Sequence, residues 1–209
     1  MNIEQFRKAA NLTGALAERW FAEMAETMDE FGINTPKRQA AFIAQIGTES
    51  AGFTRLSESF NYSVEGLVAT FPKRITLVQA GALGRKPGEK SVPLDRQAEI
   101  ANLIYGGRYG NDRDDGWRFR GRGLKQVTFR DNYLPCGEAL GLDLIASPDL
   151  LLVDINAARS AGWFWEANGC NDYADVNDIE GLTRRINGGL NGLADRKLRW
   201  TTARLALGA

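Results

Sequence analysis

Apolar residues recur at three- and four-residue steps along most of the chain, which is the spacing of an amphipathic α-helix. The first stripe covers residues 6–28 and ends at the Phe-Gly-Ile-Asn sequence of residues 31–34. Thr35 and Pro36 then have the residue types of an N-cap and a first helical position, so a second helix is expected from there to near Gly52. Later stripes predict further helices over 63–83 (two short helices), 94–105, 129–140, 154–167, 178–187 and 193–206.

Two regions lack this periodicity. Residues 81–93 are rich in Gly and Pro, and residues 106–116 combine Gly with charged side chains, so both are expected to form loops. The only strand-like segment is 117–128, in which Gln126 and Thr128 are expected to point to the same side. The pattern therefore predicts a mainly α protein with at most a small β ribbon.

The charge balance and the absence of histidine exclude several classes of function. Among 209 residues, 44% are hydrophobic, and 26 basic side chains balance 26 acidic ones. A net charge of zero argues against a dedicated nucleic-acid binder, which normally has a basic excess. The absence of histidine excludes Ser-His-Asp and Cys-His catalysis and His-ligated zinc sites.

The cysteines and the N-terminus indicate where the chain is made. Cys136 and Cys170 are too few for a disulfide scaffold or a Cys-only zinc site, and they are expected to be buried thiols. The N-terminus lacks the pattern of a secretory signal, and no apolar run approaches the ~18 residues that span a bilayer. We therefore expect a soluble protein of a reducing cytoplasm, without stable membrane insertion.

Without histidine, acid–base catalysis depends mainly on carboxylates. Glu49 lies near the end of an otherwise apolar predicted helix, where partial burial and the helix dipole disfavour its charged form. Glu58 lies in a polar loop beside Ser59, Asn61 and Tyr62, where a carboxylate can stay ionised. Hydrolysis of a glycosidic bond needs one carboxyl group of each kind. The nine-residue spacing alone is more typical of two ordinary polar residues.

Two further segments combine glycine with polar residues. In residues 117–133, a Gly-Arg-Gly turn lets the backbone pass close to a neighbour, and Gln126 and Thr128 could orient a water molecule or bind sugar hydroxyls. Residues 186–196 are a Gly-rich loop that opens a helix, which is either a simple turn or an anion-binding helix N-terminus. The basic residues of the first segment are either an anion-binding patch or a solvated face: Arg118, Arg120, Arg122 and Lys125.

Four segments together resemble the glycoside hydrolase family 19 chitinases in order and spacing: residues 41–52, 58–63, 120–128 and 186–190. The resemblance extends from about residue 36 to Trp200, and it is greatest to the phage endolysins of that family, those of phages infecting enteric bacteria. It implies a two-lobed, lysozyme-like, mainly helical fold with a cleft between the lobes. It also implies single-displacement, inverting hydrolysis that requires no metal and no cofactor.

The resemblance assigns roles to individual residues. Glu49 is similar to the general acid of the family and Glu58 to its general base, and Thr128 occupies the position that helps the base to hold the attacking water. Inversion requires these two carboxyl groups to lie roughly 6.5–9.5 Å apart. Other positions match residues of the substrate cleft or the region behind it: Tyr62, Gln126, Asn132, Asn187 and Arg196.

The chain departs from the family pattern at three positions. Thr48 replaces a histidine before the acid, Asn191 replaces an acidic residue of plant members, and Lys125 replaces an apolar residue. We expect these changes to affect substrate preference more than the acid–base pair.

The resemblance and the absence of a signal or chitin-binding module favour a peptidoglycan-degrading endolysin that hydrolyses β-1,4 bonds of the glycan strand for host lysis. Such a protein is expected to be a monomer without nucleic-acid partners, made in the host cytoplasm and released by a holin to the periplasmic wall. The alternatives are a chitinase acting on N-acetylglucosamine polymers, a lytic transglycosylase, and a non-catalytic glycan-binding relative.

The expected organisation is one catalytic module without a separate cell-wall-binding domain. Residues 1–62 and 117–209 carry the longest apolar stripes and the catalytic motifs, so they are expected to form the larger lobe. Residues 63–116 are expected to form a smaller inserted lobe.

Overall fold

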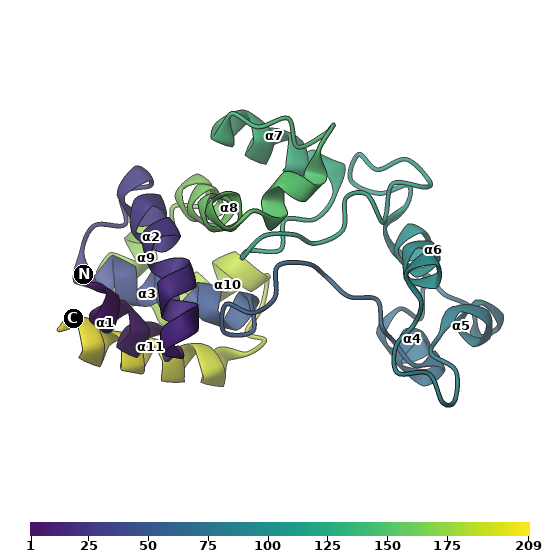
Figure 1. Ribbon diagram of the computed structural model, residues 1–209, viewed down its shortest axis with the longest axis horizontal. Helices are drawn as coiled ribbons and strands as arrows, with labels where there is room; N and C mark the ends of the chain where they lie inside the picture. Colours follow the sequence, from purple (N-terminus) through teal and green to yellow (C-terminus); the bar gives the residue numbers. More distant parts are fainter.

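The computed structural model describes residues 1–209 and is almost entirely helical, as predicted (Figure 1). It contains no β-strand. Only isolated β-bridges occur, two of which involve Arg122. The helices are α1 (Ile3–Ala10), α2 (Gly14–Glu30), α3 (Pro36–Glu49), α4 (Val64–Thr70), α5 (Leu77–Leu83), α6 (Leu94–Tyr105), α7 (Arg130–Leu140), the 3-10 helix η1 (Pro148–Leu152), α8 (Asp154–Ala167), α9 (Cys170–Asp175), α10 (Ile179–Asn187) and α11 (Leu193–Leu207).

Most predicted helices are confirmed, and the exceptions are short or interrupted. The stripe over residues 6–28 is split into α1 and α2, because Asn11 adopts a left-handed conformation with φ of 53° and Thr13 then caps α2. The pattern missed α9 and η1, which are only 6 and 5 residues long and so too short to show periodicity.

The prediction of an extended, strand-like segment over residues 117–128, before α7, is wrong. Arg122 pairs with Val127 in an antiparallel bridge, and the chain turns between them. Within this turn Gln126 has a φ of 59° and its N–H donates to the carbonyl oxygen of Gly123 at 3.1 Å. Strand alternation therefore does not explain the placement of Gln126 and Thr128.

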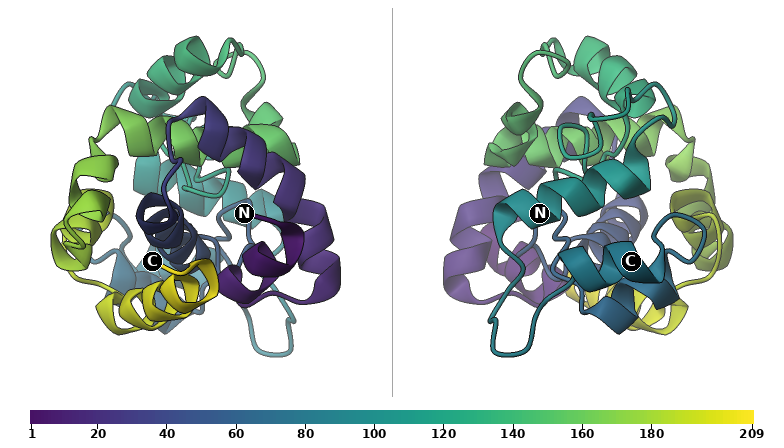
Figure 2. Two further views of the ribbon diagram at one scale, coloured as in Figure 1. Left: turned by 90° about the vertical axis from the view of Figure 1, so that its left-hand side faces the viewer. Right: turned by 90° about the vertical axis from the view of Figure 1, so that its right-hand side faces the viewer.

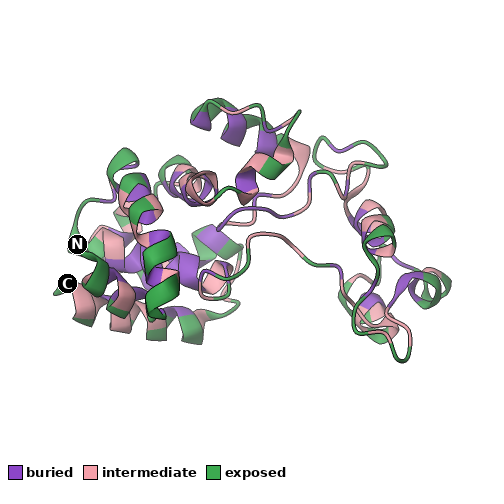
Figure 3. Cartoon of the chain, viewed as in Figure 1, coloured by how far each residue is buried: buried purple, intermediate pink, exposed green.

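The apolar residues form two separate cores, shown in purple in Figure 3. The larger core has 34 buried residues, drawn from α1–α3 and α7–α11 and the segments beside them. The smaller core has nine buried residues, between Phe60 and Ile104, and lies among α4, α5 and α6. These three helices stand apart from the others in Figure 1, and segments without helix connect them to the larger body. The lobe boundaries at residues 62 and 117 stay a prediction.

Helix α3 runs through the larger core. Eight consecutive residues, Ala40 to Gly47, are buried, which is typical of a helix that is covered on all sides. The helix packs against α11 and α1, which also pack against each other, so the two termini lie on the same side of the molecule (Figures 1 and 2). None of the helices is long and apolar enough to cross a membrane.

Both cysteines are free and buried, as expected. Burial raises the pKa of each thiol, Cys136 and Cys170, to about 12. A thiol in such surroundings stays protonated and is a poor nucleophile, so neither cysteine is a candidate for chemistry.

Candidate active site

Glu49 is the last residue of α3, so the buried helix places it at the edge of the larger core. Thr35 caps this helix and Pro36 occupies its first turn, as the sequence predicts. The side chain of Glu49 remains only 15% exposed. A carboxylate so far removed from water requires polar partners.

Arg196 of α11 is the first of these partners. Its Nη2 donates to Oε1 of Glu49, and its Nη1 donates to Oε1 of Gln45, one turn earlier on α3. Its Nε donates to the carbonyl oxygen of Asn191 at 3.3 Å. Gln45 in turn donates to Oγ1 of Thr183 at 3.1 Å. The Arg196 side chain is only 4% exposed, and this network joins α3, α10 and α11.

Lys125 is the second partner. Its Nζ lies 3.6 Å from Oε2 of Glu49 and 4.5 Å from the centre of the Phe164 ring. The two cations come from positions 76 and 147 residues further along the chain, where the local sequence gives no indication of them.

The Gly-Arg-Gly segment directs its basic residues to different partners. Arg122 is 2% exposed and pairs with Asp149 at 2.7 Å. Arg120 lies 3.9 Å above the ring of Trp117, and burial lowers its pKa. Lys125 points to Glu49. These contacts do not support the alternative of one basic patch.

Glu58 lies in the segment between α3 and α4, and neutral groups hold it. Oη of Tyr105, the last residue of α6, donates to Oε1 of Glu58 at 2.8 Å. The N–H of Gly121 donates to Oε2 at 3.1 Å, and the N–H of Glu58 donates to the carbonyl oxygen of Gly121 at 2.8 Å. Burial and the charge of Glu58 raise the pKa of Tyr105, so its phenol remains a donor.

Two glycines, Gly121 and Gly123, allow side chains to lie close to the backbone of this segment. A Cβ atom on Gly121 would lie 3.2 Å from Oε2 of Glu58 and 3.0 Å from Oε1 of Gln126, so both side chains flank this residue. Gly123 has a φ of 75°, and a Cβ atom there would lie 2.5 Å from Oγ of Ser160 on α8. The predicted close approach of the backbone at this turn is confirmed.

Three of the predicted site residues meet in one pocket. Gln126, Thr128 and Asn132 line a cavity of about 420 Å³, together with Lys125 and with Trp163 and Phe164, two aromatic residues of α8. Oγ1 of Thr128 donates to the carbonyl oxygen of Gln126 at 2.9 Å, and Nδ2 of Asn132 donates to that of Thr128 at 2.8 Å. The pocket combines polar groups with aromatic faces, a mixture suited to sugar rings.

The two remaining predicted residues lie elsewhere. Tyr62 is half-buried and packs edge-on against Phe71 at 5.4 Å between ring centres. Its pKa is raised by burial and by the charge of Glu58, so it belongs to the surroundings of that carboxylate. Asn187 ends α10 and is exposed, before the turn at Gly188, and no side-chain hydrogen bond joins it to the other site residues.

Sequence reasoning missed several contributors to the site. Tyr105, Trp163 and Phe164 were not among the predicted site residues, and they fall within predicted helices where nothing in the local pattern distinguishes them. The one local signal was Gln45, a polar residue in a stretch that is otherwise apolar.

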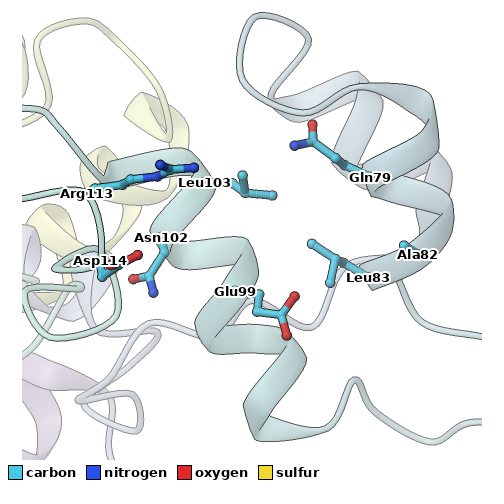
Figure 4. Close-up of a pocket in the computed structure, with 8 residues that line it drawn as sticks. All are labelled: Gln79, Ala82, Leu83, Glu99, Asn102, Leu103, Arg113 and Asp114. Carbon is cyan, nitrogen blue, oxygen red and sulfur yellow. The ribbon is translucent and has the colours of Figure 1, made fainter.

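A second pocket shares none of the residues described above. Its volume is 380 Å³, and it opens between α5 and α6, with Arg113 and Asp114 at one end (Figure 4). No group of three His, Cys, Asp or Glu residues in the protein is arranged to hold a metal ion.

Comparison with known proteins decides the family. A protein of Haemophilus influenzae described as a glycosyl hydrolase family 19 domain-containing protein is 38% identical over 179 residues, which are 84% of this chain and 83% of that protein. This chain belongs to glycoside hydrolase family 19. The family model for class I chitinases also matches, over residues 105–181, a span that contains Gln126, Thr128 and Asn132.

Plant relatives and solved structures agree with this family 19 assignment. Endochitinase 3 of Solanum tuberosum is 45% identical over 95 residues, a match that covers 36% of this chain and 30% of the plant enzyme. A bacterial family 19 chitinase has a TM-score of 0.64 at 20% identity, covering 100% of this chain and 95% of that one. Chitinase C of Streptomyces griseus has a TM-score of 0.62 at 19% identity, covering 100% and 92%. The protein is thus a chitinase-like glycoside hydrolase.

Proposed function

We propose that this family 19 enzyme is a phage endolysin that hydrolyses the β-1,4 bonds of peptidoglycan glycan strands. Glu49 acts as the general acid, Glu58 as the general base, and Thr128 helps to hold the attacking water. Tyr62, Gln126, Asn132 and Asn187 bind the glycan, and Arg196 orients Glu49.

One observation carries the proposed pair of carboxylates. Both of them touch the same short segment, residues 121–128: Lys125 pairs with Glu49, and the N–H of Gly121 donates to Glu58. Thr128 ends this segment and lines the adjoining pocket. Two carboxylates, one from α3 and one from the following loop, therefore contact the same short segment, which supports the proposed pair.

The proposed reaction balances with one water molecule. Glu49 gives its proton to the oxygen of the leaving sugar as the glycosidic bond breaks. Glu58 takes a proton from the water, whose oxygen bonds to the anomeric carbon from the opposite face. Because Glu49 must carry a proton at the start and Glu58 must not, activity is expected to fall on both sides of an optimum pH.

The test uses purified bacterial peptidoglycan and chitin oligomers in parallel, with products identified by mass spectrometry. Products from peptidoglycan that gain one water and end in reducing N-acetylmuramic acid support the proposal. Anhydro-sugar products indicate a lytic transglycosylase instead. A first-formed α-anomer, observed by NMR, supports inversion, whereas a β-anomer contradicts it.

A chitinase is the second candidate, favoured by the endochitinase relatives described above. Cleavage of chitin oligomers with no release from peptidoglycan would select it. Binding to either polymer without any product would select a non-catalytic relative.

The proposed biological role is lysis of an enteric bacterial host. The protein would act as a monomer, without nucleic-acid partners, on the periplasmic wall after a holin opens the inner membrane. Expression in bacterial cytoplasm, alone and together with a holin, tests this role. Rapid lysis only when both are produced supports it, and no lysis with the holin contradicts it.

A further inference from the structure

Lys125, the second cation at Glu49, lies outside the hydrogen-bond network that holds Arg196, the first. Arg196 contacts three acceptors, Glu49, Gln45 and the backbone of Asn191, so it is part of the packing between helices. Lys125 contacts only Oε2 of Glu49 and the ring of Phe164. At 3.6 Å its interaction with Glu49 is an ion pair rather than a short hydrogen bond.

The position of Lys125 is built into the fold. Its backbone lies in the turn that ends in the bridge between Arg122 and Val127. The neighbouring Leu124 is fully buried, and its N–H donates to the carbonyl oxygen of Ala157 on α8 at 3.2 Å. The Lys125 side chain is 13% exposed, in contrast to a mobile surface lysine. The ammonium group is therefore held in one place between Glu49 and α8.

We propose that Lys125 is a positioning residue that, through its charge on Glu49, sets the pH above which the enzyme loses activity. This inference rests on the proposed role of Glu49 as the acid. An adjacent cation stabilises the carboxylate and makes proton uptake harder. A general acid is active only in its protonated form, so the cation places the alkaline limb of the pH profile at a lower pH than Glu49 would have without it.

The other charged groups near Glu49 are held by contacts that do not involve Lys125. From α11, Arg196 bonds to Glu49 directly, while Arg199 pairs with Asp195 at 2.9 Å. Asp195 also accepts a hydrogen bond from Thr48, the residue before Glu49, at 2.7 Å. No hydrogen bond or ion pair reaches Glu49 from α1 or α9, which also pack on α3.

The test compares Lys125→Met and Lys125→Arg with the wild type. Met is an unbranched side chain only one heavy atom shorter, which can still pack against Phe164 but carries no charge, whereas Arg keeps the charge. The alkaline limb of the hydrolysis profile should move up by about one pH unit in K125M and stay in place in K125R. Lys197→Met is the matched control, because Lys197 forms an exposed ion pair with Glu180 and its loss removes the same net charge.

A second measurement is independent of catalysis. NMR titration of the Glu49 side-chain carboxyl group, assigned with the Glu49→Gln variant, follows proton uptake in each folded protein. A midpoint that rises in K125M but not in K125R or K197M supports the proposal. Equal midpoints in all four proteins overturn it, as does an equal rise in K197M. Full activity of the folded E49Q variant would instead overturn the proposed function, so the two failures are distinguishable.

Discussion

The surroundings of Glu49 and Glu58 differ in both charge and origin. Glu49 ends a helix that runs through the larger core, and it is held by the cations Arg196 and Lys125. Glu58 lies in a segment without helix, and it is held by neutral donors, one of which is Tyr105 beside the smaller core. One carboxylate is thus held by charged groups and the other by neutral hydrogen-bond donors, so the two can be perturbed separately.

The largest effect is expected from Glu49→Gln. An amide of the same shape cannot donate the required proton, so hydrolysis should fall by roughly 10²–10⁴-fold. Product release from purified peptidoglycan measures the loss, and circular dichroism with thermal unfolding checks that the fold persists. Near-normal turnover by a folded E49Q protein would remove Glu49 from the role of acid.

The next largest effect is expected from Tyr105→Phe, which changes the surroundings of Glu58 and leaves those of Glu49 intact. It removes one donor from Glu58 and keeps the ring, so Glu58 should bind a proton more readily and turnover should fall about tenfold. The acidic limb of the pH profile should move up, because the base is active only when ionised, whereas the alkaline limb should stay. An unchanged acidic limb would show that this hydrogen bond does not act on the base.

A smaller loss, about fivefold, is expected from Thr128→Ala. The variant removes one neutral hydrogen-bonding hydroxyl, while Glu58 can still hold the water. Initial rates on a soluble glycan oligomer measure it, with Thr201→Ala on the exposed side of α11 as control. A rate equal to that of the wild type would make Thr128 structural.

The smallest effect concerns stability away from the site. Arg159 of α8 forms a two-bond ion pair with Glu30 of α2, at 2.7 Å for each bond, and this lowers the pKa of Glu30. The pair therefore contributes stability above the ordinary pKa of 4.5, and this contribution is lost as the pH falls through the lowered value. Glu30→Gln should destabilise the protein by up to about 1 kcal/mol at pH 7, with a smaller difference in acid. Urea unfolding at both pH values measures this; a constant difference contradicts it.

The helices could be predicted wherever periodicity and caps agree. Thr35 and Pro36 mark the start of α3, and the predicted limits of α6 match the structure at residues 94 and 105. Beyond the Gly-Arg-Gly turn, the conformation of residues 122–127 could not be predicted, because it depends on Gly123 packing against α8 and on the positive φ of Gln126. The alternation of polar and apolar residues there has the period of a strand, but the structure forms a turn instead.

The amino-acid sequence by itself determined the mainly helical class, the exclusion of histidine chemistry, and the family resemblance that marks Glu49, Glu58 and Thr128. These features are readable because helix periodicity, caps and motifs extend over a few neighbouring residues. Only the tertiary structure decided which groups hold the carboxylates. Arg196 meets Glu49 across 147 residues and Tyr105 meets Glu58 across 47, and such contacts exist only once packed helices bring distant charges and donors together.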